Sequence, residues 1–255
     1  MGKKGKVGRL KRKPAPRFWP IHRKEAVWIV RPSSGPHSLE KCLPLSIVLR
    51  DLLELAETRK ESKKIITQGK IYVDGKVRLK DDFPIGLMDV ISIPDMKKFY
   101  RVLPSHKGLL LNPISKEKAS FKLMRIEDKT LVKNENSQVA LHDGTNILVK
   151  AEAPEHASEV VYETFATLKV ALPEKQVLEQ IKTKKGNIAI ITGGKNIGKQ
   201  GKIVEIEKTV AKKRRGALVV IEDEKGGRYQ TILDFVFSIG EVQSLISLPE
   251  ANAVV

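Results

Sequence analysis

The sequence predicts a multidomain protein of α+β and β structure that begins with a basic, extended N-terminal arm. Three observations support this fold class. A dense run of cations opens the chain, a two-helix-plus-hairpin pattern follows it, and short alternating runs separated by Gly, Asn and Asp fill much of the rest. Runs of that kind are typical of strands joined by turns. Aromatic residues make up only 5% of the 255 residues, so the cores must be aliphatic.

The charge of the chain is concentrated at its start. The formal net charge is +17, and the first 24 residues hold ten cations and no carboxylate. Such a block repels itself and has little apolar surface to bury, so we expect an arm that is disordered in the free protein. A nucleic acid is favoured over a solvated tail that only aids solubility, because each neutralised phosphate releases a counterion. Phe18 and Trp19 offer stacking surfaces within the run. The ten cations are Lys3, Lys4, Lys6, Arg9, Lys11, Arg12, Lys13, Arg17, Arg23 and Lys24.

Composition also excludes several kinds of site. The single cysteine, Cys42, excludes an internal disulfide and a Cys-rich zinc site, and the five histidines show no metal-ligand spacing. No apolar run approaches the roughly 20 residues that span a bilayer, and the N-terminus lacks the apolar segment of a secretory signal. We therefore expect an intracellular, soluble protein without metal, cofactor or small-molecule substrate.

The segment Arg31-Pro-Ser-Ser-Gly-Pro-His37 closes the arm. Its prolines and glycine predict extended backbone. Two roles remain open for it, a linker or a phosphate contact through Arg31 and the serines.

Residues 42 to 94 predict a compact α+β module. Pro44 suits the first turn of a helix, and apolar residues then recur at helical spacing from Leu45 to Ala56. Thr58 and Glu61 form a capping box that begins a second helix, which Gly69 ends. A hairpin is predicted over 71–79 with its turn at Asp74-Gly75, followed by a third strand over 90–93.

The second helix has two distinct faces. Ile65 and Ile66 point to the core, and the opposite arc carries Arg59, Lys60, Lys63 and Lys64. This helix and the hairpin resemble the RNA-binding module of ribosomal small-subunit protein four. The resemblance implies an RNA-facing surface made of Arg59, Lys60, Lys63, Lys64, Lys70, Lys76 and Arg78.

The middle of the chain predicts a small β-rich domain without catalytic chemistry. Strands are expected over 121–126, 138–141, 146–149 and 164–172, and a helix over 173–182. Leu141-His142-Asp143-Gly144 is interpreted as a turn rather than a catalytic group.

A glycine-rich loop follows. Gly193 to Lys199 fits most of the nucleotide-binding P-loop pattern. However, Gln200 replaces the Mg²⁺-binding hydroxyl, and a β run over 203–206 replaces the helix that would cap a phosphate. We therefore predict no nucleotide site here.

The same loop resembles a KOW motif, in which a glycine lets two strands of an SH3-like barrel cross closely. Gly198, Gly201, Ile191 and Ile203 carry the resemblance, with later strands expected over 217–221 and 229–236. Further RNA contacts are expected from basic loop residues, namely Lys195, Lys199, Lys212, Lys213, Arg214 and Arg215.

Taken in order, these parts resemble ribosomal small-subunit protein four of the archaeal and eukaryotic "e" type. The resemblance implies a non-enzymatic, structural constituent of the small subunit in the cytoplasm, bound to ribosomal RNA and neighbouring ribosomal proteins. An RNA-modifying enzyme and a KOW-type transcription factor are the alternatives. Arg31 and Trp19 complete the predicted RNA contacts. The expected parts are a basic extension (1–41), an RNA-binding module (42–96), a central β-rich domain (97–180), a KOW SH3-like barrel (181–241) and a C-terminal tail (242–255).

Overall fold

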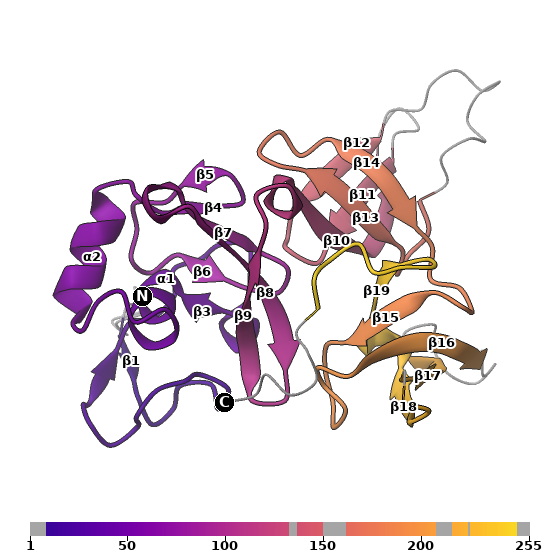
Figure 1. Cartoon of the computed structure of the whole chain (residues 1–255), viewed down its shortest axis with the longest axis horizontal. Coiled ribbons are helices and arrows are strands. Elements are labelled where there is room, and N and C mark those ends of the chain that lie inside the picture. The colour runs from indigo at the N-terminus through magenta and orange to yellow at the C-terminus, as the bar shows by residue number, and fades with distance from the viewer. Residues whose placement is uncertain (1–8, 133–136, 150–161, 208–215, 224, 249–255) are drawn as a thin grey trace, which may run out of the picture. The chain divides into compact units, whose positions relative to one another are not determined.

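The computed structural model describes residues 9–132, 137–149, 162–207, 216–223 and 225–248, which are mostly β-structure (Figure 1). The chain forms two compact units. The N-terminal unit comprises Met1–Val102 and Lys107–Pro113, and the C-terminal unit comprises Leu103–His106 and Ile114–Val255. Among the described residues, no helix is long and apolar enough to cross a membrane.

The described residues of the N-terminal unit form two α-helices and three small sheets, and the last residues of strands β8 and β9 extend into the C-terminal unit. Strands β1 and β2 pair with each other, β3 pairs with β6, and five strands form a sheet in the order β5-β4-β7-β8-β9. The strands are β1 (Leu10–Lys11), β2 (Trp28–Ile29), β3 (Leu43–Pro44), β4 (Tyr72–Val73), β5 (Lys76–Val77), β6 (Pro84–Ile85), β7 (Val90–Ile93), β8 (Lys98–Ser105) and β9 (Gly108–Ile114). The sequence patterns missed the pair β3–β6, whose two-residue strands are too short to show any alternation.

The first predicted helix is shorter than its apolar pattern. Helix α1 (Leu45–Ile47) continues as a π-helical turn over Val48–Leu52, and the chain leaves the helix near Glu54, which has a positive φ of 52°. Leu45, Val48 and Leu49 are buried in the core, Leu52 packs against it partly buried, and Ala56 is buried in the connecting loop. The pattern therefore identified the buried residues correctly but extended the helix too far.

The second predicted helix is confirmed. Helix α2 spans Arg59–Thr67, and the capping box is complete: Thr58 Oγ1 accepts from the Glu61 N–H (3.3 Å), and Glu61 Oε2 accepts from the Thr58 N–H (3.4 Å). Hydrogen bonding by the Thr58 side chain and by the Glu57 and Thr58 N–H groups holds the pKa of the Glu61 carboxyl below its usual value. Gly69 follows the helix with φ of 74°, a conformation that glycine adopts without steric cost.

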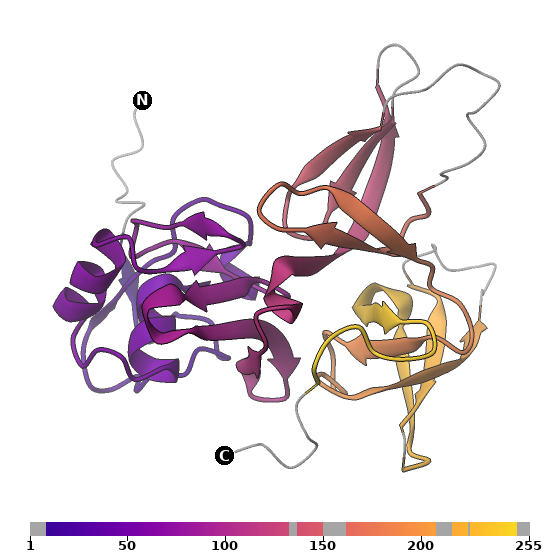
Figure 2. The ribbon, with the colours of Figure 1, turned by 45° about the horizontal axis from the view of Figure 1, so that its top comes forward.

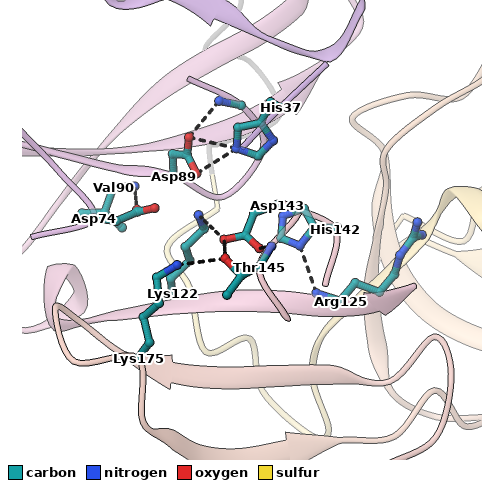
Figure 3. Close-up of polar contacts among 11 residues, drawn as sticks. His37, Asp74, Asp89, Val90, Lys122, Arg125, His142, Asp143, Thr145 and Lys175 are labelled. Carbon is teal, nitrogen blue, oxygen red and sulfur yellow. Dashed lines mark hydrogen bonds and ion pairs between the residues drawn. The ribbon is translucent and has the colours of Figure 1, made fainter. Parts of the chain in front are cut away.

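The hairpin and third strand are confirmed as well. Asp74 and Gly75 both have positive φ (52° and 74°), as a type I′ turn requires. Asp74 Oδ1 also accepts from the Val90 N–H at 3.0 Å, which ties the turn to β7 (Figure 3).

The segment before the module is packed rather than loose. His37 is buried, and its Nε2 lies 3.0 Å from Asp89 Oδ2, which also accepts from the Gly86 N–H at 2.9 Å (Figure 3). The Ser33 N–H donates to the Asp82 carbonyl at 2.8 Å. These contacts fix residues 31–37 against the module, so the segment is not a free linker.

The C-terminal unit contains two five-stranded antiparallel sheets, coloured from magenta to yellow along the chain in Figure 2. The strand orders are β12-β11-β10-β13-β14 and β18-β17-β16-β15-β19. The strands are β10 (Phe121–Leu131), β11 (Ser137–Leu141), β12 (Asn146–Val149), β13 (Thr167–Ala171), β14 (Val177–Ile181), β15 (Ile188–Ile191), β16 (Gln200–Glu207), β17 (Leu218–Glu222), β18 (Arg228–Ile232) and β19 (Val236–Gly240). Arg125 links the two sheets, because its guanidinium donates to the carbonyls of Asp234 (2.5 Å) and Val236 (3.1 Å).

The predicted helix over 173–182 is wrong. Residues 177–181 form strand β14, which pairs with β13. A tight turn reverses the chain before it: the Ala171 N–H donates to the Gln176 carbonyl, and Lys175 adopts a positive φ of 64°. A short apolar run fits either period, and here the neighbouring strand selects the extended form.

The turn predicted at 141–144 is confirmed, and it carries a buried ion pair (Figure 3). Lys122 is fully buried, and its Nζ lies 3.5 Å from Asp143 Oδ2. Asp143 also accepts from Thr145 N–H (3.0 Å) and Oγ1 (2.9 Å), and Lys175 Nζ donates to that hydroxyl. Burial acts to raise the pKa of Asp143, but Lys122 and the Thr145 N–H outweigh it and hold the pKa below its usual value.

Replacing Asp143 by Asn should destabilise the protein at neutral pH by about 3–5 kcal/mol, because it leaves the Lys122 ammonium buried beside a neutral amide. A carboxyl with a lowered folded-state pKa stabilises fully above its unfolded value near 4 and loses that effect as pH falls through the folded pKa. Urea unfolding at pH 7 should therefore separate the variant from the wild type, and unfolding at pH 3 should bring them closer. Asp128→Asn, on an exposed part of β10, is the matched control. An equal stability difference at both pH values would contradict this account.

The glycine-rich loop lies between β15 and β16 and leads directly into a strand. Strand β16 begins at Gln200, so the helix that a P-loop needs does not follow the loop. Gly201 lies against β17, where an added Cβ would stand 2.1 Å from the Glu222 carbonyl oxygen. The strands can therefore approach this closely only if residue 201 has no side chain.

Gly201→Val should lower the free energy of unfolding by about 1–3 kcal/mol or more. The new Cβ would clash with backbone atoms of Glu222 and Asp223, which cannot move aside as a flexible side chain could. Chemical denaturation measures the effect. Lys202→Val places the same side chain at the next, exposed position of β16 and should change stability little. If both variants have the same stability, Gly201 is not needed for a close approach.

Candidate nucleic-acid interface

Residues 9–41 form part of the N-terminal unit, which corrects the expectation of a disordered arm for this stretch. Strand β1 pairs with β2 in the register Leu10↔Ile29 and Lys11↔Trp28. The residues pack because the segment contains apolar side chains that reach the module, among them Ala15, Trp19 and Val30, all buried. Lys3, Lys4 and Lys6 lie outside the described residues.

Two of the predicted RNA-binding cations hold this segment together instead. Arg12 is buried and donates to the His22 carbonyl (2.6 Å) and Glu25 Oε2 (2.8 Å). That hydrogen bond holds the pKa of Glu25 below its usual range. The Arg23 guanidinium donates to four backbone carbonyls at 2.8–3.1 Å, those of Arg12, Lys13, Ala15 and Pro16. Both side chains are thus committed to the fold of this segment.

Trp19 is not a stacking surface for a base, contrary to the prediction. Its side chain is 3% exposed and lies in the core, and its Nε1–H donates to the Cys42 carbonyl at 2.9 Å. The other tryptophan, Trp28, is 52% exposed. The guanidinium carbon of Arg9 and the ammonium of Lys11 lie 5.7 and 5.9 Å from its ring centroid. No pattern in the sequence separates the two rings, because strand β2 is only two residues long and shows no alternation.

The basic arc of helix α2 is exposed as predicted, but its members differ. Lys60, Lys63 and Lys64 are exposed. Arg59 donates to Asp81 Oδ2 from Nε and Nη2 at 3.0 and 2.9 Å, while its side chain keeps 57% exposure. The three lysines therefore form the exposed cationic face of this helix.

The remaining predicted residues of the N-terminal unit lie on or near the hairpin. Lys76 is exposed, and Lys70 forms an exposed pair with Asp95 at 3.3 Å. The Arg78 guanidinium lies over the ring of Phe83 at 4.2 Å. Arg78 is half-buried, so its packing contributes to the fold of the hairpin.

The C-terminal unit carries the other predicted residues. Lys195 and Lys199 of the glycine-rich loop are exposed, and Lys199 Nζ lies 5.5 Å from the Tyr229 ring centroid. The predicted basic loop lies outside the described residues, namely Lys212, Lys213, Arg214 and Arg215.

Cysteine and metal chemistry have no support among the residues that the structure describes. Burial raises the pKa of Cys42 to about 12, so its thiol stays protonated at neutral pH. Within the described ranges, no three His, Cys, Asp or Glu side chains gather as they would around a metal ion.

Replacing the two tryptophans should lower stability by very different amounts. Trp19→Ala should lower the free energy of unfolding by about 3–5 kcal/mol, because it removes a buried ring and leaves a cavity. Trp28→Ala should change it by about 0.5 kcal/mol or less, because the ring is half exposed. Chemical denaturation followed by circular dichroism measures both. Similar losses for the two variants would contradict their separate roles.

The capped helix with exposed cations and the exposed tryptophan beside cations are features that nucleic-acid-binding proteins share. Family models agree and are more specific. Residues 4–40 match the RS4NT (NUC023) domain, residues 44–91 the S4 domain and residues 96–177 the ribosomal family S4e. The chain is 47% identical to the small ribosomal subunit protein eS4 of Staphylothermus marinus over 98% of this chain and 99% of that one. It is 42% identical to the eS4 protein of Methanocaldococcus jannaschii over 97% and 100% of the two chains.

A solved structure shares the fold. The crystal structure of the 30S ribosomal protein S4e from Thermoplasma acidophilum aligns with a TM-score of 0.66 and 29% identity, covering 81% of this chain and 99% of that chain. The chain belongs to the ribosomal S4e family.

Proposed function

We propose that this protein is a structural constituent of the small ribosomal subunit and binds ribosomal RNA. The observation that carries the proposal is the near full-length identity to proteins named small ribosomal subunit protein eS4. The exposed lysines of helix α2 support it physically, because they present positive charge without a structural role in the core. The protein acts in the cytoplasmic ribosome, without catalysis, beside neighbouring ribosomal proteins.

We further propose the division of labour within the chain. The module over 42–96 binds RNA through helix α2 and the hairpin, and residues 181–241 form a KOW-type SH3-like barrel. The antiparallel sheet β18-β17-β16-β15-β19 and the close approach of Gly201 to the Glu222 carbonyl support the barrel. The domain over 97–180 and the tail over 242–255 are assigned as further parts of the ribosomal assembly.

The triple replacement of Lys60, Lys63 and Lys64 by Gln should weaken binding to small-subunit ribosomal RNA. Each phosphate contact contributes roughly 0.7–0.9 to the slope of log K against log salt, so the slope should fall by about 2. Melting temperature should change little, because all three side chains are exposed. Filter binding across a salt series measures the slope.

The matched control removes three exposed lysines of the C-terminal unit, Lys116, Lys129 and Lys185, and changes net charge equally. An equal loss in both triple variants would show that only total charge matters, which contradicts a specific role for helix α2. Co-sedimentation of the wild-type protein with small subunits after a high-salt wash tests the ribosomal assignment itself. Release under conditions that retain the subunit's other proteins would refute it.

A further inference from the structure

A cavity of about 390 Å³ lies within the N-terminal unit, bordered by strands β1 and β2 and the first residue of helix α2. Its lining brings together an indole, three guanidinium groups and one carboxylate, those of Trp28, Arg9, Arg31, Arg59 and Asp82. The volume falls at the small end of the range typical of ligand sites. An aromatic surface beside several arginines is the combination that recognises a base together with its phosphates.

The indole is held in position but remains accessible. Trp28 stands opposite Lys11 in the β1–β2 ladder, which fixes its backbone, and half of its side chain is exposed. Arg9 and Lys11 lie within about 6 Å of the ring centroid, the range of cation–π contacts. An exposed tryptophan gains free energy when a flat partner covers it, and a nucleobase is such a partner.

The charges of the lining favour a phosphate but are not uniform. Asp81 orients the Arg59 guanidinium at 2.9 Å, and the arginine side chain is still 57% exposed. Three arginines outnumber the single carboxylate of Asp82, so the cavity keeps an excess of positive charge. The Asp82 carboxylate can accept a hydrogen bond from a base amino group or from a ribose hydroxyl, whereas a phosphate offers it no donor.

We propose that this cavity binds one unstacked nucleotide of single-stranded RNA, with its base on Trp28 and its phosphates on the arginines. The inference rests on the proposed ribosomal RNA binding and assigns one subsite within it. A paired base cannot enter, because stacking on an indole requires that the base leave the helix. An acidic peptide would use the cations but not the indole, so the exposed ring favours RNA.

Tryptophan fluorescence of the full-length protein can test the subsite directly. The chain has two tryptophans, and Trp19 is buried, so the difference between wild type and Trp28→Phe reports on Trp28. A short single-stranded RNA should quench this emission saturably. An RNA of the same length with abasic positions should quench this emission far less at equal phosphate concentration. Duplex RNA, and poly-glutamate at an equal concentration of negative charges, should also quench it far less.

Affinity separates stacking from charge. Trp28→Leu should weaken binding of the single-stranded RNA about 5- to 100-fold with an unchanged salt slope, because it removes stacking but no cation. Trp28→Phe should restore much of the affinity. Arg9→Gln should instead lower the slope by about 0.7. Melting temperatures of all three variants should match the wild type, which excludes unfolding as the cause.

Each contrary result has one meaning. If Trp28→Leu binds single-stranded RNA like the wild type, or if abasic RNA or poly-glutamate quenches equally, the nucleotide subsite is refuted. If Trp28→Leu still binds small-subunit ribosomal RNA, and if this RNA does not quench Trp28 in the wild type, the subsite is refuted while the proposed function stands. A wild-type protein that binds no ribosomal RNA would refute the proposed function and the subsite together.

Discussion

The indole of Trp19 fixes the cationic N-terminal segment to the aliphatic core. It is buried among residues of the module, and its Nε1–H donates to the Cys42 carbonyl at 2.9 Å. The Arg23 guanidinium donates hydrogen bonds to four backbone carbonyls of the same segment, and strand β1 pairs with strand β2. Without this packing, a block of like charges with few apolar side chains would not order itself. The positions of Arg9, Lys11 and Trp28 all follow from this anchor.

An ordered cationic segment binds differently from a loose one. A disordered arm loses conformational freedom when it binds, and that cost reduces the affinity gained from each phosphate contact. Residues 9–41 lose this conformational freedom when the protein folds, so that binding does not have to order them. The buried His37–Asp89 contact joins residues 52 positions apart and is a second attachment of the segment to the module. Folding and presentation of the binding surface are thus one event in this unit.

The features that the sequence predicted correctly are those set by neighbours along the chain. The Thr58–Glu61 capping box and the Asp74-Gly75 turn depend on a few adjacent residues, and both are present as predicted. The errors concern choices made by distant packing. Trp19 and Trp28 sit in similar basic surroundings in the sequence, and only the fold decides which ring is buried. The apolar residues of strand β14 fit a helical spacing equally well, and pairing with β13 is what makes this segment extended. Which arginines remain exposed could not be predicted for the same reason.

Net charge therefore overstates the surface that phosphate can reach. Arg101 and Lys122 are fully buried, and burial lowers the pKa of Arg101 to about 10 while Asp74 opposes that shift. Of the seven described cations among residues 9–24, Arg12 and Arg23 are bonded within the protein, which leaves five for phosphate. At roughly 0.7–0.9 per contact, those five account for a salt slope of about 3.5 to 4.5. Among the described residues of the N-terminal unit, any larger contribution must come from outside residues 9–24, and helix α2 supplies further exposed cations. The electrostatic part of the RNA-binding free energy therefore depends on how many cations stay exposed, and not on the total number of cations in the chain.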